Sequence, residues 1–479
     1  MRSATTIKRL SAGCAAAAIA AFAGASGVSA VRLTRSGRSA QAARAIVRIV
    51  PQVRLADPRP PVDLPGHHSS GLRPVPAAGP IAGGYTPAQI RAAYFMNPLL
   101  RRGIRGKGQS IVIVDSFGSP TIRHDLAVFD KQFKIAAPPS LMIIHPAGKI
   151  PPYNGSPTRA SWAFETTLDV EWSHAMAPGA RIVLVETPTS ENEGVSGFPQ
   201  IVKAEKYVIA HHLGGVISQS FGATEETFPK GTLRPLRGAY LQAARPANNV
   251  TVVSASGDAG ATDFQNNMRD YFTHPVTSWP ASDPLVTSVG GLDLALNSRG
   301  QRLAPDQVWN DQGTSPSAGG GGKSIMFSRP AYQNVVASVV GSHRGVPDIS
   351  MSASCRHPVN VYGSFPAGQG NRPGWFLICG TSEATPLFAG VIALADQLAG
   401  RPLGPINGYL YQMMTTRQRG IVDITRGNNT VSFTQHGKSY TVQGWTAVPG
   451  YDLASGIGTI EAKWFVPELV AMFRRAHHS

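Results

Sequence analysis

The sequence is poor in cysteine and in charged residues, which make up 3 positions and 15% of the 479 residues. It also lacks internal repeats and any basic motif interleaved with aromatic residues. The formal net charge of +16 therefore gives no reason to expect a nucleic-acid partner. More than half of this excess of positive charge lies in the first 84 residues. We interpret it as tolerance of acidic surroundings or as loose attraction to anionic envelopes.

The N-terminus reads as an export signal. Arg2, Lys8 and Arg9 precede an Ala-rich apolar stretch, and Val28–Ala30 is typical of a cleavage site, which predicts a signal peptide at residues 1–30. Gly and Ser make the stretch too weakly apolar to predict a membrane span. Because arginines just beyond it are atypical of a signal peptide, an uncleaved membrane anchor is the alternative. We expect a secreted protein, extracellular or periplasmic, with no stable membrane span after signal removal.

A connector rich in Pro, Ala and Arg follows at residues 31–84, and one large domain is predicted at 85–479. With 42% hydrophobic residues, the chain can bury a sizeable core. Apolar runs alternate with helical stretches, which predicts an α/β fold with a mostly parallel central sheet and helices on both faces. The expected strands are 110–114, 181–185, 215–218 and 251–254, and the expected helices include 200–213 and 233–244.

The segment from Cys379 to Gly390 is the most informative part of the chain. Its small residues deliver one hydroxyl, that of Ser382, into the start of a long apolar helix. Backbone N–H groups and the helix dipole at such a position suit an oxyanion formed beside the hydroxyl. The alternative is an ordinary helix N-cap.

A serine hydroxyl needs a neighbouring base, and two carboxylates are candidates. Glu165 and Asp169 are spaced i, i+4 in a helical pattern, so both point from one helix face. Close carboxylates repel when both are ionised, and such a pair can hold and pass a proton in acid. The alternative is a solvated acidic face. No histidine stands in a setting that places an imidazole at a helix start.

Asp258 is a third acidic candidate, because it directly follows the strand-like run Val250–Ser254 and a short glycine-containing turn. The carboxyl ends of strands in open α/β sheets are where loops collect functional side chains. A plain connecting turn is the alternative.

With these residues, the chain resembles the sedolisins, or serine-carboxyl peptidases, over roughly 395 residues. Single motifs could match by chance, but here they follow one another in the order of the family. The motifs are Tyr85–Tyr94, Gly108–Gly118, Ile217–Gly222, Ser256–Asp258, Ser278–Asp283, Gly319–Ser324, Val346–Ser350 and Gly380–Ser382. The resemblance implies a subtilisin-like fold and a serine-type endopeptidase that cleaves proteins or peptides at acidic pH. We expect a monomer.

By the same resemblance, Ser382 is the nucleophile and Glu165 its general base. Asp169 orients Glu165 and shares its proton. Asp258 completes the oxyanion hole and must be protonated to donate a hydrogen bond, so acid operation follows. The backbone at Ser220 and Gly222 is expected to pair with an extended substrate.

The resemblance further implies one structural Ca²⁺ ion near the C-terminus. Its ligands would be the carboxylates of Asp423 and Asp452 and the carbonyls of Ile424, Val448 and Gly450. Val448 replaces a more usual glycine, which a carbonyl ligand tolerates. A surface turn stabilised by aspartate is the alternative.

Three further features shape the expectations. Cys355 and Cys379 remain after signal removal and are expected to pair in an oxidising compartment, with two free thiols as the alternative. The run Ser317–Ser324 echoes a phosphate-binding loop but lacks the first glycine and the strand-to-helix context, so no nucleotide is expected. Phe221 stands where the family often has Trp, which removes an indole donor.

The connector departs from the family, whose precursors commonly carry a large folded prosegment. Residues 31–84 are too few for one, so the enzyme either folds without an inhibitory prodomain or uses this short arm for a reduced version of that task. Two other functions stay open: a catalytically silent binding protein on the same scaffold, and a histidine-dependent subtilisin-type enzyme. Cleavage specificity and endopeptidase versus tripeptidyl-peptidase mode are not predicted.

Overall fold

A computed structural model describes residues 50–51, 54–55, 79–190, 197–313, 315–366 and 373–478. The chain divides into the units Met1–Arg44 and Ala45–Ser479, and all described residues belong to the second. The predicted signal peptide and most of the predicted connector lie outside the described residues. Among those residues, no helix has both the length and the apolar composition needed to cross a bilayer.

An eight-stranded sheet forms the centre of the fold, in the order β11-β10-β8-β6-β3-β5-β4, with β14 paired to β10. Its neighbours are parallel except for β11, which is antiparallel to β10. The mostly parallel sheet and the subtilisin-like α/β fold are therefore confirmed. The strands are β3 (Ser110–Ser116), β4 (Leu141–Ile144), β5 (Arg181–Thr187), β6 (Val216–Gln219), β8 (Thr251–Ala255), β10 (Thr287–Asp293), β11 (Gln307–Val308) and β14 (Ile349–Ser352).

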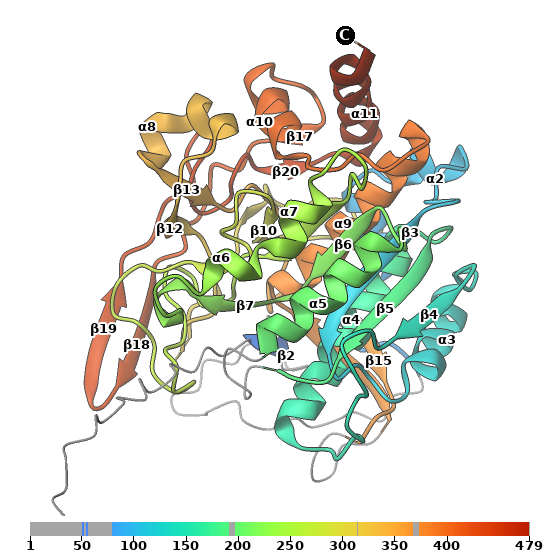
Figure 1. Cartoon of the computed structure of the whole chain (residues 1–479), viewed down its shortest axis with the longest axis horizontal. Coiled ribbons are helices and arrows are strands. Elements are labelled where there is room, and N and C mark those ends of the chain that lie inside the picture. The colour runs from blue at the N-terminus through green and yellow to red at the C-terminus, as the bar shows by residue number, and fades with distance from the viewer. Residues whose placement is uncertain are drawn as a thin grey trace, which may run out of the picture. The chain divides into compact units, whose positions relative to one another are not determined.

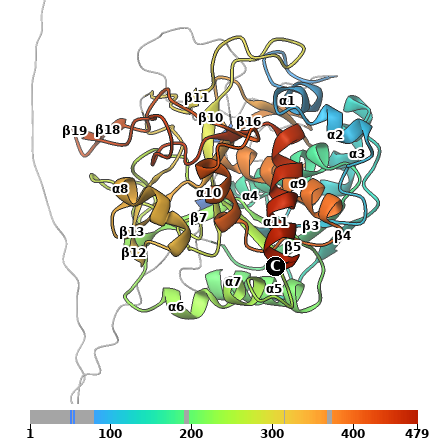
Figure 2. The same ribbon diagram turned by 90° about the horizontal axis from the view of Figure 1, so that it is seen from above.

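Alternate residues of the central strands enter two separate hydrophobic clusters, as the period of a strand requires. Ile111 and Ile113 of β3 belong to the cluster that includes helices α4, α9 and α11, whereas Val112 and Val114 belong to the one that includes α5 and α7. Figure 2 shows α5 and α7 on one side of the strands and α9 on the other. Burial on both faces explains why these strands read as continuous apolar runs.

Helices fill the connections between strands (Figure 1). The helix expected at 233–244 is divided in two, because Pro235 and Gly238 both disfavour a continuous helix interior. The helices are α1 (Pro87–Ala93), α2 (Asn97–Arg101), α3 (Ile122–Phe133), α4 (Pro157–Met176), α5 (Gly197–Ala210), α6 (Leu233–Leu236), α7 (Gly238–Ala243), α8 (Ala337–Val340), α9 (Thr381–Ala399), α10 (Asn407–Thr415) and α11 (Ala462–His478), with 3-10 turns η2 (Glu225–Thr227) and η3 (Ala331–Val336).

Smaller sheets surround the central one, in the pairings β1-β7-β9, β15-β16-β2, β12-β13, β17-β20 and β18-β19. Their strands are β1 (Val50–Pro51), β2 (Arg54–Leu55), β7 (Phe221–Thr224), β9 (Ser278–Trp279), β12 (Gly322–Ser328), β13 (His343–Val346), β15 (Val359–Gly363), β16 (Gly374–Cys379), β17 (Ile421–Val422), β18 (Val431–Gln435), β19 (Lys438–Val442) and β20 (Thr459–Ile460). Two of these sheets therefore join connector residues to the body of the domain.

Helices α4 and α9 pack directly against each other. A Cβ added at Gly390 of α9 would lie 2.5 Å from the Cβ of Met176 on α4, so the approach requires glycine at this position. This packing brings the middle of α4 to the first turn of α9. Residues 165 and 382, far apart in the sequence, therefore meet where the middle of α4 faces the first turn of α9.

Candidate active site

Ser382 occupies the turn between a strand and a helix. Strand β16 ends at Cys379, and Gly380 then adopts φ +114°, a conformation that residues with a Cβ rarely take. Ser382 is the second residue of α9 and is fully buried. Its hydroxyl therefore lies at the positive end of a 19-residue helix.

The hydroxyl of Ser382 donates a hydrogen bond to Oε2 of Glu165 at 2.9 Å. It also lies 3.4 Å from the carbonyl oxygen of Ser220. Among the described residues, no histidine ring hydrogen-bonds to Ser382. Burial, together with the charges of Asp169 and Asp115, raises the pKa of Glu165 well above its usual value.

Asp169 lies one turn further along α4 and is fully buried, as Glu165 is. The alternative of a solvated acidic face is therefore wrong. The hydroxyl of Ser220 donates to Oδ1 of Asp169 at 2.9 Å. Burial and the neighbouring Asp115 raise the pKa of Asp169 well above its usual value, so the pair can hold a proton that an exposed pair would lose.

Asp258 reaches the same site from the turn that follows β8. Its Oδ1 accepts hydrogen bonds from the backbone N–H of Thr381 at 2.7 Å and from the Thr381 hydroxyl at 2.8 Å. Its Oδ2 accepts no hydrogen bond within the described residues. Burial raises the pKa of Asp258 to about 6, so the carboxyl is neutral in moderate acid and its second oxygen can then carry a proton to donate.

The glycine-rich run before β12 braces the turn that holds Asp258. Gly320 donates its N–H to the carbonyl of Gly257 at 2.7 Å, and the hydroxyl of Ser256 donates to the carbonyl of Gly320 at 2.7 Å. Ala318 donates its N–H to the carbonyl of Asp258 at 3.1 Å. The run continues into a strand, not a helix, which agrees with the prediction that it is no phosphate-binding loop.

A family model described as the subtilase family matches residues 158–437, a span that contains Glu165, Asp258 and Ser382. The chain belongs to the subtilase family. It is 31% identical over 389 residues to kumamolisin of Bacillus sp. (strain MN-32), covering 80% of this chain and 63% of that relative. It is 30% identical over 275 residues to sedolisin of Pseudomonas sp. (strain 101), covering 56% and 43%.

Human tripeptidyl-peptidase 1 is 30% identical over 317 residues, covering 64% of this chain and 51% of that relative. Among solved structures, Pseudomonas sedolisin, a serine-carboxyl proteinase in complex with pseudo-iodotyrostatin, has a TM-score of 0.67 at 25% identity and covers 82% of this chain and 98% of its own. These matches confirm the resemblance to the sedolisins. The chain spans less than two thirds of the length of each of these curated relatives.

A fourth carboxyl group of this sedolisin-like site was missed from the sequence. Asp115 ends the apolar run of β3 and is fully buried beside Glu165 and Asp169, whose pKa values its charge raises. Burial raises the pKa of Asp115 itself to about 7. An acidic residue at the carboxyl end of an otherwise apolar strand was the available signal.

Residues 220–222 form the edge expected to pair with substrate, and a connector strand lies on it. Backbone pairing aligns Val50 of β1 with Gly222, and Pro51 with Phe221, in antiparallel register. On the other side of Ser382, β2 pairs with β16 so that Arg54 lies opposite Cys379. Phe221 packs its ring 6.1 Å from that of Trp162 and contributes no hydrogen bond to the acids.

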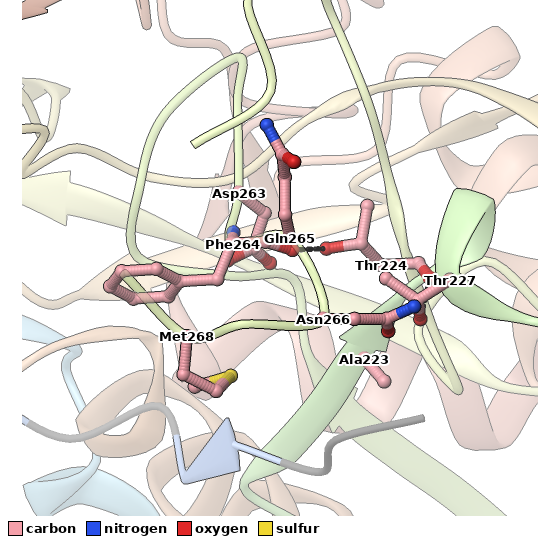
Figure 3. A pocket seen from close by; sticks show the side chains of 8 residues that line it. All are labelled: Ala223, Thr224, Thr227, Asp263, Phe264, Gln265, Asn266 and Met268. Atoms are coloured by element: carbon pink, nitrogen blue, oxygen red, sulfur yellow. Dashed lines mark hydrogen bonds between the residues drawn. The ribbon is translucent and has the colours of Figure 1, made fainter. Parts of the chain in front are cut away.

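A small pocket adjoins this edge, lined by Thr224 of β7 and by residues of the 263–268 loop (Figure 3). The hydroxyl of Thr224 donates to the carbonyl of Phe264 at 2.9 Å, as the dashed line in Figure 3 marks. Buried Asp263 accepts hydrogen bonds from the Ser278 hydroxyl at 2.6 Å and the Phe264 N–H at 2.8 Å. The pocket is therefore fixed by hydrogen bonds on both of its sides.

Cys355 and Cys379 form a disulfide with a Cα–Cα distance of 5.0 Å. The bond ties the chain after β14 to the residue that precedes the Gly380 turn. Cys379 is also the partner of Arg54 in the β2–β16 pairing, so the disulfide holds the end of β16 from which the chain enters the turn before Ser382.

The residues expected to bind calcium lie together in one loop region near the C-terminus. Asp423 accepts the N–H of Gly450 at 2.8 Å, and Asp452 accepts the N–H of Val448 at 3.1 Å. The carboxylates therefore face the same short loop, and the side chain of Val448 points toward solvent, exposed by 44%. A donor set of carboxylates and backbone carbonyls suits a hard cation such as Ca²⁺.

Proposed function

We propose that the protein is a secreted serine-carboxyl endopeptidase that hydrolyses peptide bonds at acidic pH. The observation that carries this proposal is the 2.9 Å hydrogen bond from the Ser382 hydroxyl to Glu165, made inside a cluster of buried carboxyl groups. The antiparallel strands on both sides of Ser382 support cleavage within a chain, because a chain can continue past the nucleophile in both directions.

In this mechanism, Glu165 takes the proton of the Ser382 hydroxyl while Oγ attacks the substrate carbonyl carbon. Negative charge moves to the carbonyl oxygen, and the protonated Oδ2 of Asp258 donates a hydrogen bond to it. When the peptide C–N bond breaks, Glu165 returns the proton to the leaving amine. Water then hydrolyses the acyl-enzyme through the same proton transfers in reverse.

Asp169 acts on this sequence of steps through Glu165. Its negative charge favours the protonated form of Glu165, so the proton received from Ser382 stays on the glutamate until the amine takes it. The hydroxyl of Ser220 holds Asp169 in place. Because Glu165 must begin ionised and Asp258 neutral, activity is expected over a limited range of acidic pH.

One structural Ca²⁺ ion is part of the proposal. Asp423 and Asp452, with the carbonyls of Ile424, Val448 and Gly450, would hold it, and the hydrogen bonds that gather this loop support the assignment. The ion would supply no chemistry to Ser382, and it would stabilise the C-terminal loops. The Cys355–Cys379 disulfide supports secretion into an oxidising compartment.

Digestion of a denatured protein at pH values from about 3 to 8 tests the function, with the wild type compared with Ser382→Ala and Glu165→Gln. We expect internal fragments from the wild type in acid and none from either variant. Glu205→Gln is the matched control, because Glu205 is an equally buried glutamate on α5, on the opposite side of the sheet.

The products separate the remaining alternatives. Release of tripeptides alone would indicate a tripeptidyl-peptidase mode. Full activity of Glu165→Gln, or an alkaline optimum, would instead favour a histidine-dependent enzyme. A folded wild type that is inert at every pH would indicate a silent binding protein.

A further inference from the structure

His145, Glu186 and Asp115 form one row across the central sheet. Strands β4, β5 and β3 run parallel and side by side (Figure 1), and Asp115 is the partner of Glu186 in the β3–β5 register. Ile144, the last residue of β4, pairs with Val185, so His145 follows next to Glu186 at the same edge of the sheet. The carboxyl ends of three neighbouring strands therefore supply one row of titratable side chains.

The row leads from solvent to the buried site. The His145 side chain is 43% exposed and that of Glu186 is 10% exposed, whereas Asp115 is fully buried. Nε2 of His145 lies 2.7 Å from Oε2 of Glu186, within hydrogen-bond distance. A Cβ added at Gly118 would lie 1.8 Å from Oε1 of Glu186, so the loop after β3 passes directly over this carboxyl group and needs glycine there. The position of Glu186 is therefore fixed from both sides.

The charged groups of the row act on one another in sequence. Burial raises the pKa of Glu186, and the hydrogen bond and charge of His145 act in the opposite direction. Burial also raises the pKa of Asp115, to about 7, and the charge of Glu186 adds to that rise. Burial is again the main cause of the raised pKa values of Glu165 and Asp169 on α4, and the charge of Asp115 adds to both. A charge on Glu186 therefore reaches the general base through Asp115.

Two further charged groups approach this set from other elements. Arg159 of α4 holds its guanidinium 3.5 Å from the centre of an aromatic ring in the loop after β3. Asp258, in the turn after β8, adds to the raised pKa of Glu165, which burial mainly causes. The charged neighbour that acts on Asp115 is Glu186.

We propose that Glu186, paired with His145, is a positioning residue that keeps Asp115 protonated. The negative charge of the buried carboxyl groups then lies on Glu165 and Asp169, where the reaction needs it, because Glu165 must begin ionised to take a proton from the nucleophile. The inference rests on the proposed function and adds a residue that sets its pH range. A charge on Asp115 would instead favour the protonated, inactive form of the base.

His145 keeps Glu186 charged without cancelling its effect on Asp115. β5 lies between β4 and β3, so the carboxyl group of Glu186 is one strand away from Asp115 and the imidazole is two strands away. Neighbouring strands are about 4.8 Å apart, and water screens the exposed imidazole more than the buried carboxylate. The negative end of the pair therefore dominates at Asp115.

The direction of the pH effect follows from these couplings. Without the charge of Glu186 the pKa of Asp115 falls, so Asp115 ionises at lower pH. Its charge then raises the pKa of Glu165 further, and the base becomes available only at higher pH. Loss of Glu186 should therefore move the acid limb of the kcat/KM profile to higher pH, while the alkaline limb, which Asp258 sets, stays in place.

The test is the pH profile of kcat/KM for one fluorogenic peptide, measured on the full chain from about pH 3 to about pH 8. We expect Glu186→Gln to raise the midpoint of the acid limb by about half to one pH unit, less than the roughly one to three units of a charge in direct contact, because it acts through Asp115. Below that midpoint, kcat/KM should then fall about three- to tenfold. His145→Ala should move the limb in the same direction and no further, since Glu186 then loses only part of its charge.

Two comparisons distinguish this role from a structural one. In the Asp115→Asn background the amide cannot ionise, so Glu186→Gln should leave the acid limb in place. His357→Ala is the matched control, because it removes the histidine of a similar pair at the end of β10, where Nδ1 lies 2.5 Å from Oδ1 of Asp293. It should move neither limb. An acid limb that Glu186→Gln leaves unchanged overturns the proposal, and so does an equal shift in the Asp115→Asn background or an equal fall in rate at every pH.

A second measurement does not depend on activity. In chains carrying Ser382→Ala, the stability gained on Asp115→Asn grows with pH until Asp115 is ionised in the folded state, and it is constant above that pH. In urea unfolding we expect this levelling near pH 7 in the parent and about one unit lower with Glu186→Gln. A levelling pH that does not move overturns the proposal, even where Asp115→Asn abolishes activity.

Failure of this inference and failure of the proposed function give different results. If Glu186→Gln leaves the acid limb unchanged while the wild type digests protein in acid, the positioning role alone is wrong. If the wild type is inert at every pH, the proposed function fails and the inference fails with it, whatever the levelling pH does.

Discussion

Replacing Asp258 by Asn tests whether the hydrogen-bond donor at this position must come from protonation of the carboxyl group. The amide oxygen can still accept both hydrogen bonds from Thr381, which are 2.7 and 2.8 Å long in the native site. The amide nitrogen then takes the place of Oδ2 and donates at every pH, whereas the native carboxyl donates only when it is protonated. We therefore expect Asp258→Asn to fold but to be impaired in acid.

The size of the effect follows from the pKa of Asp258, which burial raises to about 6. In the wild type the protonated fraction falls from about 99% at pH 4 to about 10% at pH 7. In acid, Asn should lower kcat/KM by no more than the roughly 10²- to 10³-fold that loss of one oxyanion donor costs. Between pH 4 and pH 7 the ratio of variant to wild type should then rise about tenfold.

The assay is kcat/KM for one fluorogenic peptide at half-unit steps from pH 3.5 to 8, with both enzymes in the same buffers. The charge of Asp258 contributes to the raised pKa of Glu165, so comparing Asp258→Asn with Asp258→Ala, which both lack that charge, removes the ionisation of Glu165 from the comparison. Circular dichroism shows whether the variants stay folded. Asp258→Ala, which can donate at no pH, serves as the control: its ratio should rise by the same factor, because the rise comes from the wild type, but from a lower value in acid. A flat ratio for Asp258→Asn would refute the role of Asp258 as a proton-dependent donor.

Three further predictions follow from other parts of the structure. Burial raises the pKa of Asp115 from 3.8 to about 7, so ionisation of this residue destabilises the folded protein at high pH. In urea unfolding, Asp115→Asn should therefore be more stable than the wild type by up to about 4 kcal/mol at pH 8 and equally stable near pH 3. A loss of stability at pH 8 would contradict this prediction. Chelation of calcium should lower the Tm of the wild type but not that of Asp423→Asn, whereas equal sensitivity of the two would place any metal elsewhere. Reduction of the Cys355–Cys379 bond, which closes a loop of sequence separation 24, should reduce the free energy of unfolding by about 3 kcal/mol, and an unchanged unfolding midpoint with reductant would argue against that contribution.

Local patterns were enough to predict the parts of the fold that depend on neighbouring residues. The apolar runs at 110–114 and 251–254 became β3 and β8 because strands buried on both faces need no polar alternation. The prediction that Glu165 and Asp169 point from one helix face is confirmed, because α4 is a regular helix in which residues i and i+4 lie on the same side. The helix expected at 233–244 was divided, since turn-forming residues inside it outweighed its apolar periodicity.

Contacts between distant segments could not be predicted in the same way. Asp115 meets Glu165 only because β3 and α4 pack together, and no local pattern records that packing. Arg54 and Asp258 are 204 positions apart, and the connector has little hydrophobic periodicity that would indicate a strand. The glycine run at 319–322 shows that a local pattern can also mislead. Its sequence resembles a phosphate-binding loop, whereas in the structure its hydrogen bonds support the turn that holds Asp258.

Protonation of the buried carboxyl groups affects both catalysis and the stability of the fold. A carboxyl group whose folded pKa is raised contributes most to stability below its unfolded value, and that contribution is lost as the pH rises toward the folded value. For Asp258, a shift from 3.8 to about 6 corresponds to roughly 3 kcal/mol. Ionisation in neutral medium would therefore weaken the fold as well as remove the oxyanion donor. Arg54 offsets that cost at Asp258, because its guanidinium stabilises the carboxylate that burial disfavours. The guanidinium becomes dispensable in acid, where the neutral carboxyl needs no counterion.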